Sequence, residues 1–209
     1  MFRSKRRPIV FPQAEHARLA GAIALAWRRE DVPLSFDSFV AGVTLHDRGY
    51  GEHDDDPIGG KMTSQHWVAI QRRGFTPRGE DAVVDLVTAL HIRRLMTPPE
   101  DDVERAARDE IDALLPELYD AAGTDAETAA AADAITNVCD RLAFEFCFEE
   151  PASGTVRGFD YTVDGHGAMT LAPWPLRMPQ QLGLLVAYRA DGYPRELEPV
   201  VVPFELRPG

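Results

Sequence analysis

Apolar residues recur at helical spacing over the first three quarters of the chain. Leu19, Ile23 and Trp27 are each four residues apart, which predicts a helix over about 13–29. The same spacing predicts four further helices, from Phe36 to about Arg48, from Thr76 to about Leu95, over 99–120 and over 125–148. A helical body up to about residue 150 is therefore expected.

The expected helix boundaries follow from capping residues. Gly49 is a suitable C-cap for the second helix, and Pro77 suits the first turn of the third. Residues 124–127 have the form of a capping box, which would open the last helix. Residues 49–78 hold seven glycines and prolines and predict a long loop, broken by a short helix around 64–72. Loops of this length in compact domains often carry function.

The pattern changes after Glu150. Residues 151–154 look like a linker, and the remainder predicts short strands separated by turns of the Asp-Gly type. The expected strands are 155–163, 168–172, 182–189 and 197–206. We therefore expect a mainly α protein: an all-α core over 1–150, and a small C-terminal antiparallel β extension over 151–209 packed on it. Trp174, between two prolines, is the expected anchor of that unit.

Composition and charge narrow the function classes. The 209 residues carry a formal charge of −12, which disfavours nucleic acid and anionic membranes as partners. No run of 18 apolar residues predicts a membrane span, and the basic N-terminus lacks the apolar stretch of a signal peptide. Cys139 and Cys147 are about 12 Å apart on the expected helix, too far for a disulfide. A cytoplasmic location is the expectation.

Histidines and aspartates on apolar faces are the candidate chemistry. His16, His46 and His91 each follow or precede core positions by three, four or seven residues. Asp47 adjoins His46 near a helix C-terminus, where a carboxylate is disfavoured, and Asp140 interrupts an otherwise apolar helix. One interpretation is that each acid forms an ion pair with the arginine next to it in sequence, Arg48 for Asp47 and Arg141 for Asp140. A divalent metal shared with the histidines is the alternative.

This ordered pattern resembles the HD superfamily of metal-dependent phosphohydrolases. The segments 13–21, 46–50, 54–57 and 139–142 are similar to a bacterial family of unknown function within that group. The resemblance implies an HD-like helical core. It also implies a divalent metal (Zn, Mn, Fe or Mg) held by four ligands, His16, His46, Asp47 and Asp140.

The resemblance also assigns roles around the metal. His91 occupies a position used for a second metal or for the leaving group, and Asp54 for a substrate-facing or outer acid. His53 and His66 are further candidates for a second metal site.

The function implied is hydrolysis of a small phosphorylated compound by a metal-activated water. We expect His91 to protonate the departing oxygen and Lys61, Arg93 and Arg94 to bind phosphate. No Gly-x-Ser-x-Gly elbow, phosphate loop or dinucleotide fingerprint offers another mechanism. The alternatives are a diiron oxygenase and a non-enzymatic, metal-stabilised ligand-binding protein.

Overall fold

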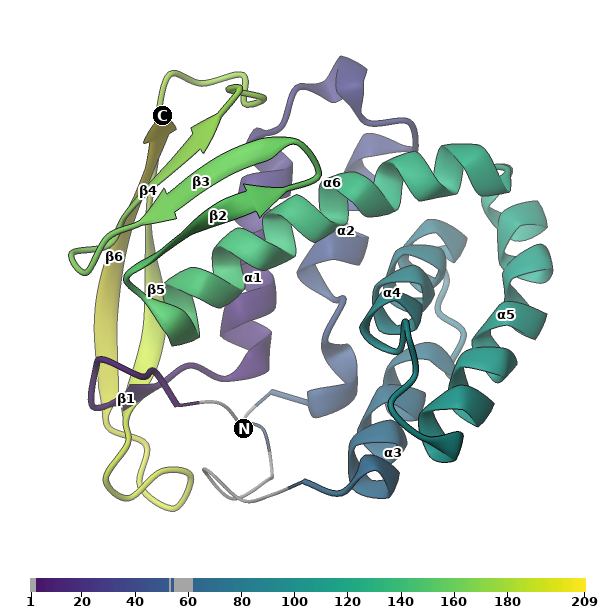
Figure 1. Cartoon of the computed structure of the whole chain (residues 1–209), viewed down its shortest axis with the longest axis horizontal. Helices are drawn as coiled ribbons and strands as arrows, with labels where there is room; N and C mark the ends of the chain where they lie inside the picture. The colour runs from purple at the N-terminus through teal and green to yellow at the C-terminus, as the bar shows by residue number, and fades with distance from the viewer. Residues whose placement is uncertain (1–2, 53, 55–61) are drawn as a thin grey trace.

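The computed structural model describes residues 3–52, 54 and 62–209. Helices occupy one side of the molecule and a curled sheet the other (Figure 1). The α-helices of the described residues are α1 Gln13–Ala26, α2 Phe36–Thr44, α3 Ser64–Phe75, α4 Ala82–Leu95, α5 Asp102–Ala122 and α6 Ala126–Phe144. Short 3₁₀ helices cover Arg29–Asp31 and Arg48–Tyr50, and a π-helical turn covers Glu145–Glu149.

Aspartate side chains cap the N-termini of three of the helices. Asp81, Asp101 and Asp125 accept hydrogen bonds from backbone N–H groups in the first turns of α4, α5 and α6. Such caps satisfy donors that the helix itself leaves unpaired. The expected start of α4 at Thr76 is therefore wrong, and the cap of α6 is Asp125 rather than Thr124.

The second helix ends earlier than its apolar pattern predicted. α2 stops at Thr44, so His46 and Asp47 lie in a tight turn before the 3₁₀ helix Arg48–Tyr50. Gly49 is not a C-cap but a close-packing residue. A Cβ added there would lie 2.3 Å from the backbone oxygen of Ile70 in α3. α3 itself is a 12-residue helix, longer than the short helix expected inside a loop.

Within the part of the chain that the structure describes, the sheet contains six strands in the order β1-β5-β6-β4-β3-β2. Their bounds are β1 Ile9–Val10, β2 Ala152–Val156, β3 Phe159–Val163, β4 Ala168–Ala172, β5 Gln181–Arg189 and β6 Pro199–Pro208. Neighbouring strands are antiparallel except β4 and β6, which run parallel.

The expected all-α core with a small antiparallel β unit is wrong. The sheet is mixed, forms a substantial layer of the molecule and includes β1 from the N-terminal region. Residues 151–154, which resemble a linker, belong mostly to β2, and the chain reverses at Arg157-Gly158 within the expected strand 155–163. A two-residue strand such as β1 is too short to produce an alternating pattern, and its pairing with β5 is a long-range contact.

One apolar core joins helices and sheet. α1 contacts β5, and α6 contacts β2 and β3, which places these two helices against the concave side of the sheet (Figure 1). Buried residues from both layers form the core, among them Phe11, Leu19, Leu142, Phe146, Leu171 and Leu206. Trp174 is partly buried at its edge, and its indole N–H donates to the Met178 carbonyl oxygen. A second cluster fills the space between α3, α4 and α5.

Two further expectations concern cysteines and membranes. Cys139 and Cys147 are free, as their spacing predicted, and both are buried. Within the described residues, no helix has both the length and the apolar character needed to cross a membrane.

Candidate metal centre

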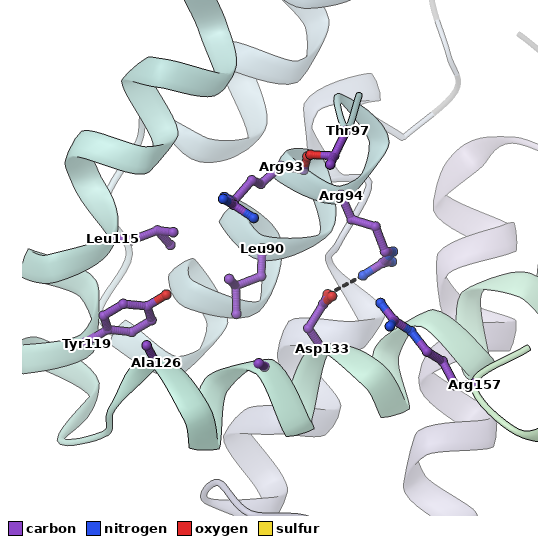
Figure 2. Close-up of a pocket in the computed structure, with 10 residues that line it drawn as sticks. Leu90, Arg93, Arg94, Thr97, Leu115, Tyr119, Ala126, Asp133 and Arg157 are labelled. Atoms are coloured by element: carbon purple, nitrogen blue, oxygen red, sulfur yellow. Dashed lines mark hydrogen bonds and ion pairs between the residues drawn. The ribbon is translucent and has the colours of Figure 1, made fainter. Parts of the chain in front are cut away.

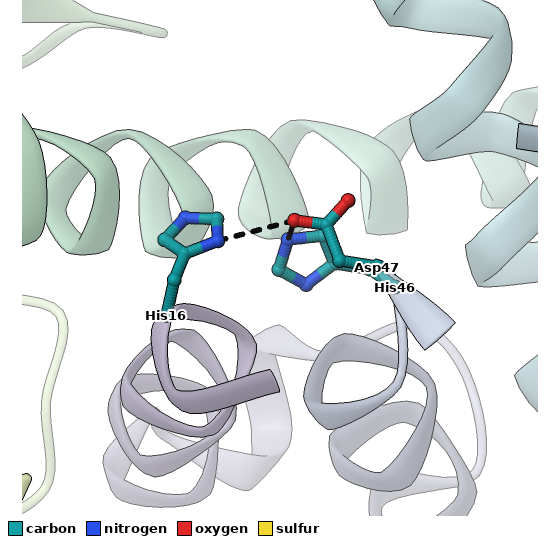
Figure 3. Close-up of side chains that lie close together, drawn as sticks. All are labelled: His16, His46 and Asp47. Atoms are coloured by element: carbon teal, nitrogen blue, oxygen red, sulfur yellow. Dashed lines mark hydrogen bonds and ion pairs between the residues drawn. The ribbon is translucent and has the colours of Figure 1, made fainter. Parts of the chain in front are cut away.

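Three histidines and two aspartates meet between α1, α4, α6 and the turn after α2. They are His16 of α1, His46 and Asp47 of the turn, His91 of α4 and Asp140 of α6. Figure 3 shows His16, His46 and Asp47 pointing toward one another from two different elements. The three imidazoles are at most 2 % exposed, and Asp47 is 6 % exposed. Side chains that the sequence separates by up to 124 positions therefore form one buried polar cluster.

A backbone carbonyl fixes the orientation of His46. Its Nδ1–H donates to the Val43 carbonyl oxygen at 2.6 Å, so a neutral His46 has its lone pair on Nε2. That Nε2 lies 3.5 Å from Asp47 Oδ2 and 3.6 Å from Asp140 Oδ1, is buried and makes no hydrogen bond among the described residues. A lone pair buried against two carboxylates is repelled unless a cation lies between them. This is the arrangement in which proteins hold a histidine as a metal ligand.

His16 bridges the two acids. Its Nδ1 lies 3.1 Å from Asp47 Oδ2, and its Nε2 lies 3.2 Å from Asp140 Oδ1. Burial opposes a charge on His16, but hydrogen bonds to Asp140 and Asp47 outweigh burial and raise its pKa. Both acids are therefore oriented toward the same small volume.

His91 contacts the cluster from the opposite side and is oriented by an arginine. Arg94 Nη2 lies 2.9 Å from His91 Nδ1, and because a guanidinium can only donate, Nδ1 is the acceptor. A neutral His91 then carries its proton on Nε2, which lies 3.4 Å from Asp47 Oδ1. Arg94 also reaches Asp140 Oδ2 at 3.2 Å. One guanidinium thus positions both His91 and Asp140.

The distances between the candidate ligand atoms suit a metal ion. Atoms bound to one ion at 2.0–2.2 Å are about 3.0–3.6 Å from each other. The contacts among the histidine nitrogens and carboxylate oxygens fall between 3.1 and 3.6 Å. Two overlapping sets of possible ligands share His46. One set is His16, His46 and Asp47, and the other is His46, His91 and Asp140. The donors are imidazole and carboxylate, a mixture that suits Zn, Mn or Fe and, with fewer nitrogens, Mg.

The histidines and aspartates of the cluster shift one another's pKa values. Burial alone would lower the pKa of His46, yet Asp47 and Asp140 raise that pKa to about 10. Burial alone would raise the pKa of each acid, yet the facing histidines hold the pKa of Asp47 and of Asp140 well below its usual value. The cluster therefore favours ionised carboxylates with positive charge beside them, supplied by protons or by a metal.

The ordinary partners proposed for the two acids pair elsewhere. Arg48 forms its ion pair with Asp85 at 2.9 Å, and Arg141 forms its pair with Glu145 at 3.2 Å. Neither arginine neutralises Asp47 or Asp140 in the way that adjacency in sequence suggested. Among the described residues, Asp140 pairs instead with Arg94 of α4, and Asp47 faces the three histidines.

Other candidate residues lie outside the cluster or outside the described residues. Asp54 is buried and packs beside the first residue of α1, since its Oδ1 accepts a hydrogen bond from the Gln13 N–H at 2.9 Å. His66 is exposed on α3. Arg93 pairs with Asp112 of α5 instead of the cluster. His53 and Lys61 fall outside the residues that the structure describes.

Sequence reasoning missed the role of Asp133. This aspartate precedes Asp140 by seven residues on α6, hence on the same helix face, and Arg94 forms an ion pair with both. The seven-residue spacing was a usable signal. That spacing did not indicate that an arginine on another helix, Arg94 of α4, pairs with both acids.

Comparison with known proteins places the chain in a family. No curated protein and no solved structure matches it. Residues 2–189 match a family described as "Protein of unknown function (DUF3891)", a span that contains all five cluster residues. Since the match covers most of the chain, this protein belongs to the DUF3891 family.

Proposed function

We propose that this protein is a metal-dependent hydrolase of a small phosphorylated compound. The observation that carries the proposal is the buried Nε2 of His46, which faces two carboxylates without a hydrogen-bond partner among the described residues. A divalent ion held by His16, His46, Asp47 and Asp140 would satisfy that nitrogen and balance both carboxylates. The resemblance to HD-superfamily phosphohydrolases supports the same choice of ligands.

The metal would lower the pKa of a bound water toward about 7 and so supply the nucleophile at neutral pH. The residues of the chain fix the ligand set and keep bulk water away, since each of the three imidazoles is at least 98 % buried. Arg94 holds Asp140 in place through a charged hydrogen bond. The four ligands come from three separate elements, α1, the turn after α2 and α6, and their burial restricts their movement, which favours precise positioning of the reacting groups.

His91 is suited to hold a proton for the leaving group. Arg94 donates to Nδ1, so a neutral His91 has its single proton on Nε2, which faces the cluster and would donate a hydrogen bond to the departing oxygen. Direct ligation through Nδ1 is blocked by the same contact. We therefore assign His91 the leaving-group role and not the second-metal role. Arg94, with Lys61 as a further expected contact, would bind the phosphoryl oxygens.

The test starts with the full-length protein purified without chelator. Metal content is measured by mass spectrometry, and hydrolysis is assayed on phosphomonoesters, phosphodiesters and nucleotides with Mn, Zn, Mg and Fe. We expect bound metal and a metal-dependent activity that chelation abolishes. His46→Ala and Asp47→Asn should lose metal and at least about 100-fold of the activity, because each removes a ligand. His166→Ala, which removes an exposed histidine from a strand turn, is the matched control.

Leaving-group dependence separates the role of His91 from that of a ligand. His91→Gln should retain metal but lose about 100-fold or more on alkyl phosphates, whose leaving oxygen develops the most negative charge and depends most on a well-placed hydrogen-bond donor. The loss should be small on nitrophenyl phosphate, whose leaving group departs as an anion. Loss of metal in His91→Gln would instead make His91 a ligand.

The second set of ligands, which includes His91, supports one competing function. A diiron oxygenase would need two ions bridged by the carboxylates of Asp47 and Asp140, with His46 bound to only one of them through its single free Nε2. Two irons per chain with dioxygen consumption and no phosphate release would establish that alternative. Bound metal with neither reaction would establish a structural, ligand-binding role.

A further inference from the structure

A polar pocket lies beside Arg94, whose Nη1 contacts Asp133 of the pocket while its Nη2 contacts His91 and Asp140 of the metal cluster. Its volume is about 520 Å³, and it is bounded by α4, α5, α6 and the turn between β2 and β3 (Figure 2). Arg93 and Arg94 line it from α4, Tyr119 from α5, Asp133 from α6 and Arg157 from the turn. A pocket of this size accommodates a small metabolite.

The pocket has an excess of positive charge. Arg93 pairs with Asp112, and Arg94 pairs with Asp133. Among the residues that the structure describes, Arg157 has no ion-pair partner within 4.0 Å. Figure 2 shows the side chains of Arg94 and Arg157 both directed toward Asp133. Because Arg94 is already paired with Asp133 and Asp140, the guanidinium group left for a ligand to neutralise is that of Arg157.

The backbone at Arg157 is unusual for an arginine. Val156 pairs with Phe159, so Arg157 and Gly158 form a two-residue hairpin turn, with φ of 50° and 82°. Asn, Asp or Gly is preferred where φ is positive, because a larger side chain is strained there. The turn therefore positions a long cation in the pocket despite a conformational cost.

Away from the guanidinium groups, the pocket is lined by apolar side chains, and those of α6 are small. Ala126 and Ala130 of α6 belong to the alanine-rich first half of that helix, and Leu90, Leu115 and the ring of Tyr119 face them. Arg157 also lines a neighbouring pocket of about 360 Å³ that contains Trp27 and Trp174. An apolar or aromatic group thus has space beside the guanidinium groups.

We propose that this pocket binds a small organic phosphate, with its phosphoryl group between Arg157 and Arg94 and its apolar part against the alanines of α6 and Tyr119. Guanidinium groups match phosphate oxygens in geometry as well as in charge. The site is distinct from the metal ligands, and Arg94 forms the wall between the two. The proposal does not depend on hydrolysis at the metal centre.

The test measures binding without turnover. Phenyl phosphate, inorganic phosphate and uncharged phenol are titrated calorimetrically into the chelator-treated full-length protein. We expect saturable binding of phenyl phosphate, weaker binding of inorganic phosphate and no binding of phenol. Arg157→Gln should weaken phenyl phosphate binding at least tenfold. Folding should be preserved, because Arg157 is exposed and has no ion pair among the described residues.

Arg207→Gln is the matched control, since it removes the same charge from an exposed position on β6. It should leave the affinity unchanged. Absence of saturable binding, or an equal effect of Arg157→Gln and Arg207→Gln, would overturn the proposal. Because no metal is present, either result leaves the hydrolase proposal untouched, and absence of hydrolysis leaves this site untouched.

Discussion

The orientation of one side chain, His46, determines where a cation or a proton can bind in the cluster. Its Nδ1 is occupied by its own backbone turn through Val43, which directs Nε2 at Asp47 and Asp140. Asp47 and Asp140 raise the pKa of His46 to about 10, so without a metal ion His46 holds a proton instead. Metal and proton therefore compete for the same position.

This competition predicts a pH-dependent stabilisation by metal. In chelator-treated protein, protonated His46 contributes stability that is complete below its unfolded pKa of 6.5 and is lost as pH rises toward about 10. The ionised Asp47 and Asp140 contribute stability present above 3.8 and lost as pH falls below it. The metal-loaded protein needs neutral His46. The difference in melting temperature between loaded and chelated protein should therefore grow from about pH 6 to pH 9.

Differential scanning fluorimetry at constant ionic strength measures how the difference in melting temperature between loaded and chelated protein changes with pH. His46→Gln lacks the titrating imidazole and should show little of this change, whereas the exposed His166→Ala should behave like the unaltered protein. A difference that is flat with pH in the unaltered protein would show that no proton leaves the cluster when metal binds.

At the scale of elements, a close helix crossing sets the spacing of the histidines. α1 and α2 approach where Gly21 faces Thr44, and a Cβ added to Gly21 would lie 2.0 Å from Thr44 Oγ1 and 3.0 Å from its Cα. The backbone of α2 itself is in the way, so a side-chain rotation cannot relieve the clash. His16 lies five residues before Gly21, and His46 lies two residues after Thr44.

Gly21→Ala should therefore separate the two helices and widen the gap between His16 and His46. We expect a loss of about 1–3 kcal/mol in the free energy of unfolding, as for overpacked cores. Metal affinity should fall at least tenfold, because ligand atoms tolerate little displacement. Chemical denaturation and competitive metal titration measure the two effects.

Gly165→Ala is the control for that substitution. Gly165 has a φ outside the left-handed region and nothing within 4 Å of an added Cβ, so both quantities should be unchanged. If Gly21→Ala lost stability but kept its metal affinity, the crossing would not position the site.

At the scale of the whole molecule, the helices and the sheet share one core. Leu171 of β4 is fully buried in the cluster that contains α1 and α6 side chains, whereas Leu184 of β5 is 66 % exposed. The two leucines thus compare a strand position facing the helices with one facing solvent.

Leu171→Ala should cost about 2–5 kcal/mol through the cavity it leaves. Leu184→Ala should change the free energy of unfolding by no more than about 0.5 kcal/mol. Because the core is shared, helical circular dichroism and tryptophan fluorescence should report one transition in Leu171→Ala, at lower denaturant than in the unaltered protein. Two separate transitions would show that the sheet and the helices unfold independently.

The sequence by itself determined the helices with strong apolar periodicity and the residues on their buried faces. α1, α5 and α6 begin and end close to the expected positions, because local spacing and side-chain capping decide them. The same local spacing put His16, His91 and Asp140 on buried faces, and all three are buried or nearly so. The His46-Asp47 pair stood out because a carboxylate is disfavoured near a helix C-terminus.

The sequence also predicted β4, β5 and β6 to within two residues, but only the tertiary structure decided the order of the strands, the addition of β1 and the partners within the site. β1 joins β5 across almost the whole chain, and the parallel pairing of β4 with β6 leaves no local signature. Arg94 rather than Arg141 contacts Asp140, and Arg48 turns away to Asp85. Neighbours in sequence point to different sides of a helix or turn, whereas contacts between elements depend on how those elements pack. The physical reason is that apolar spacing encodes which face is buried, but not what it is buried against.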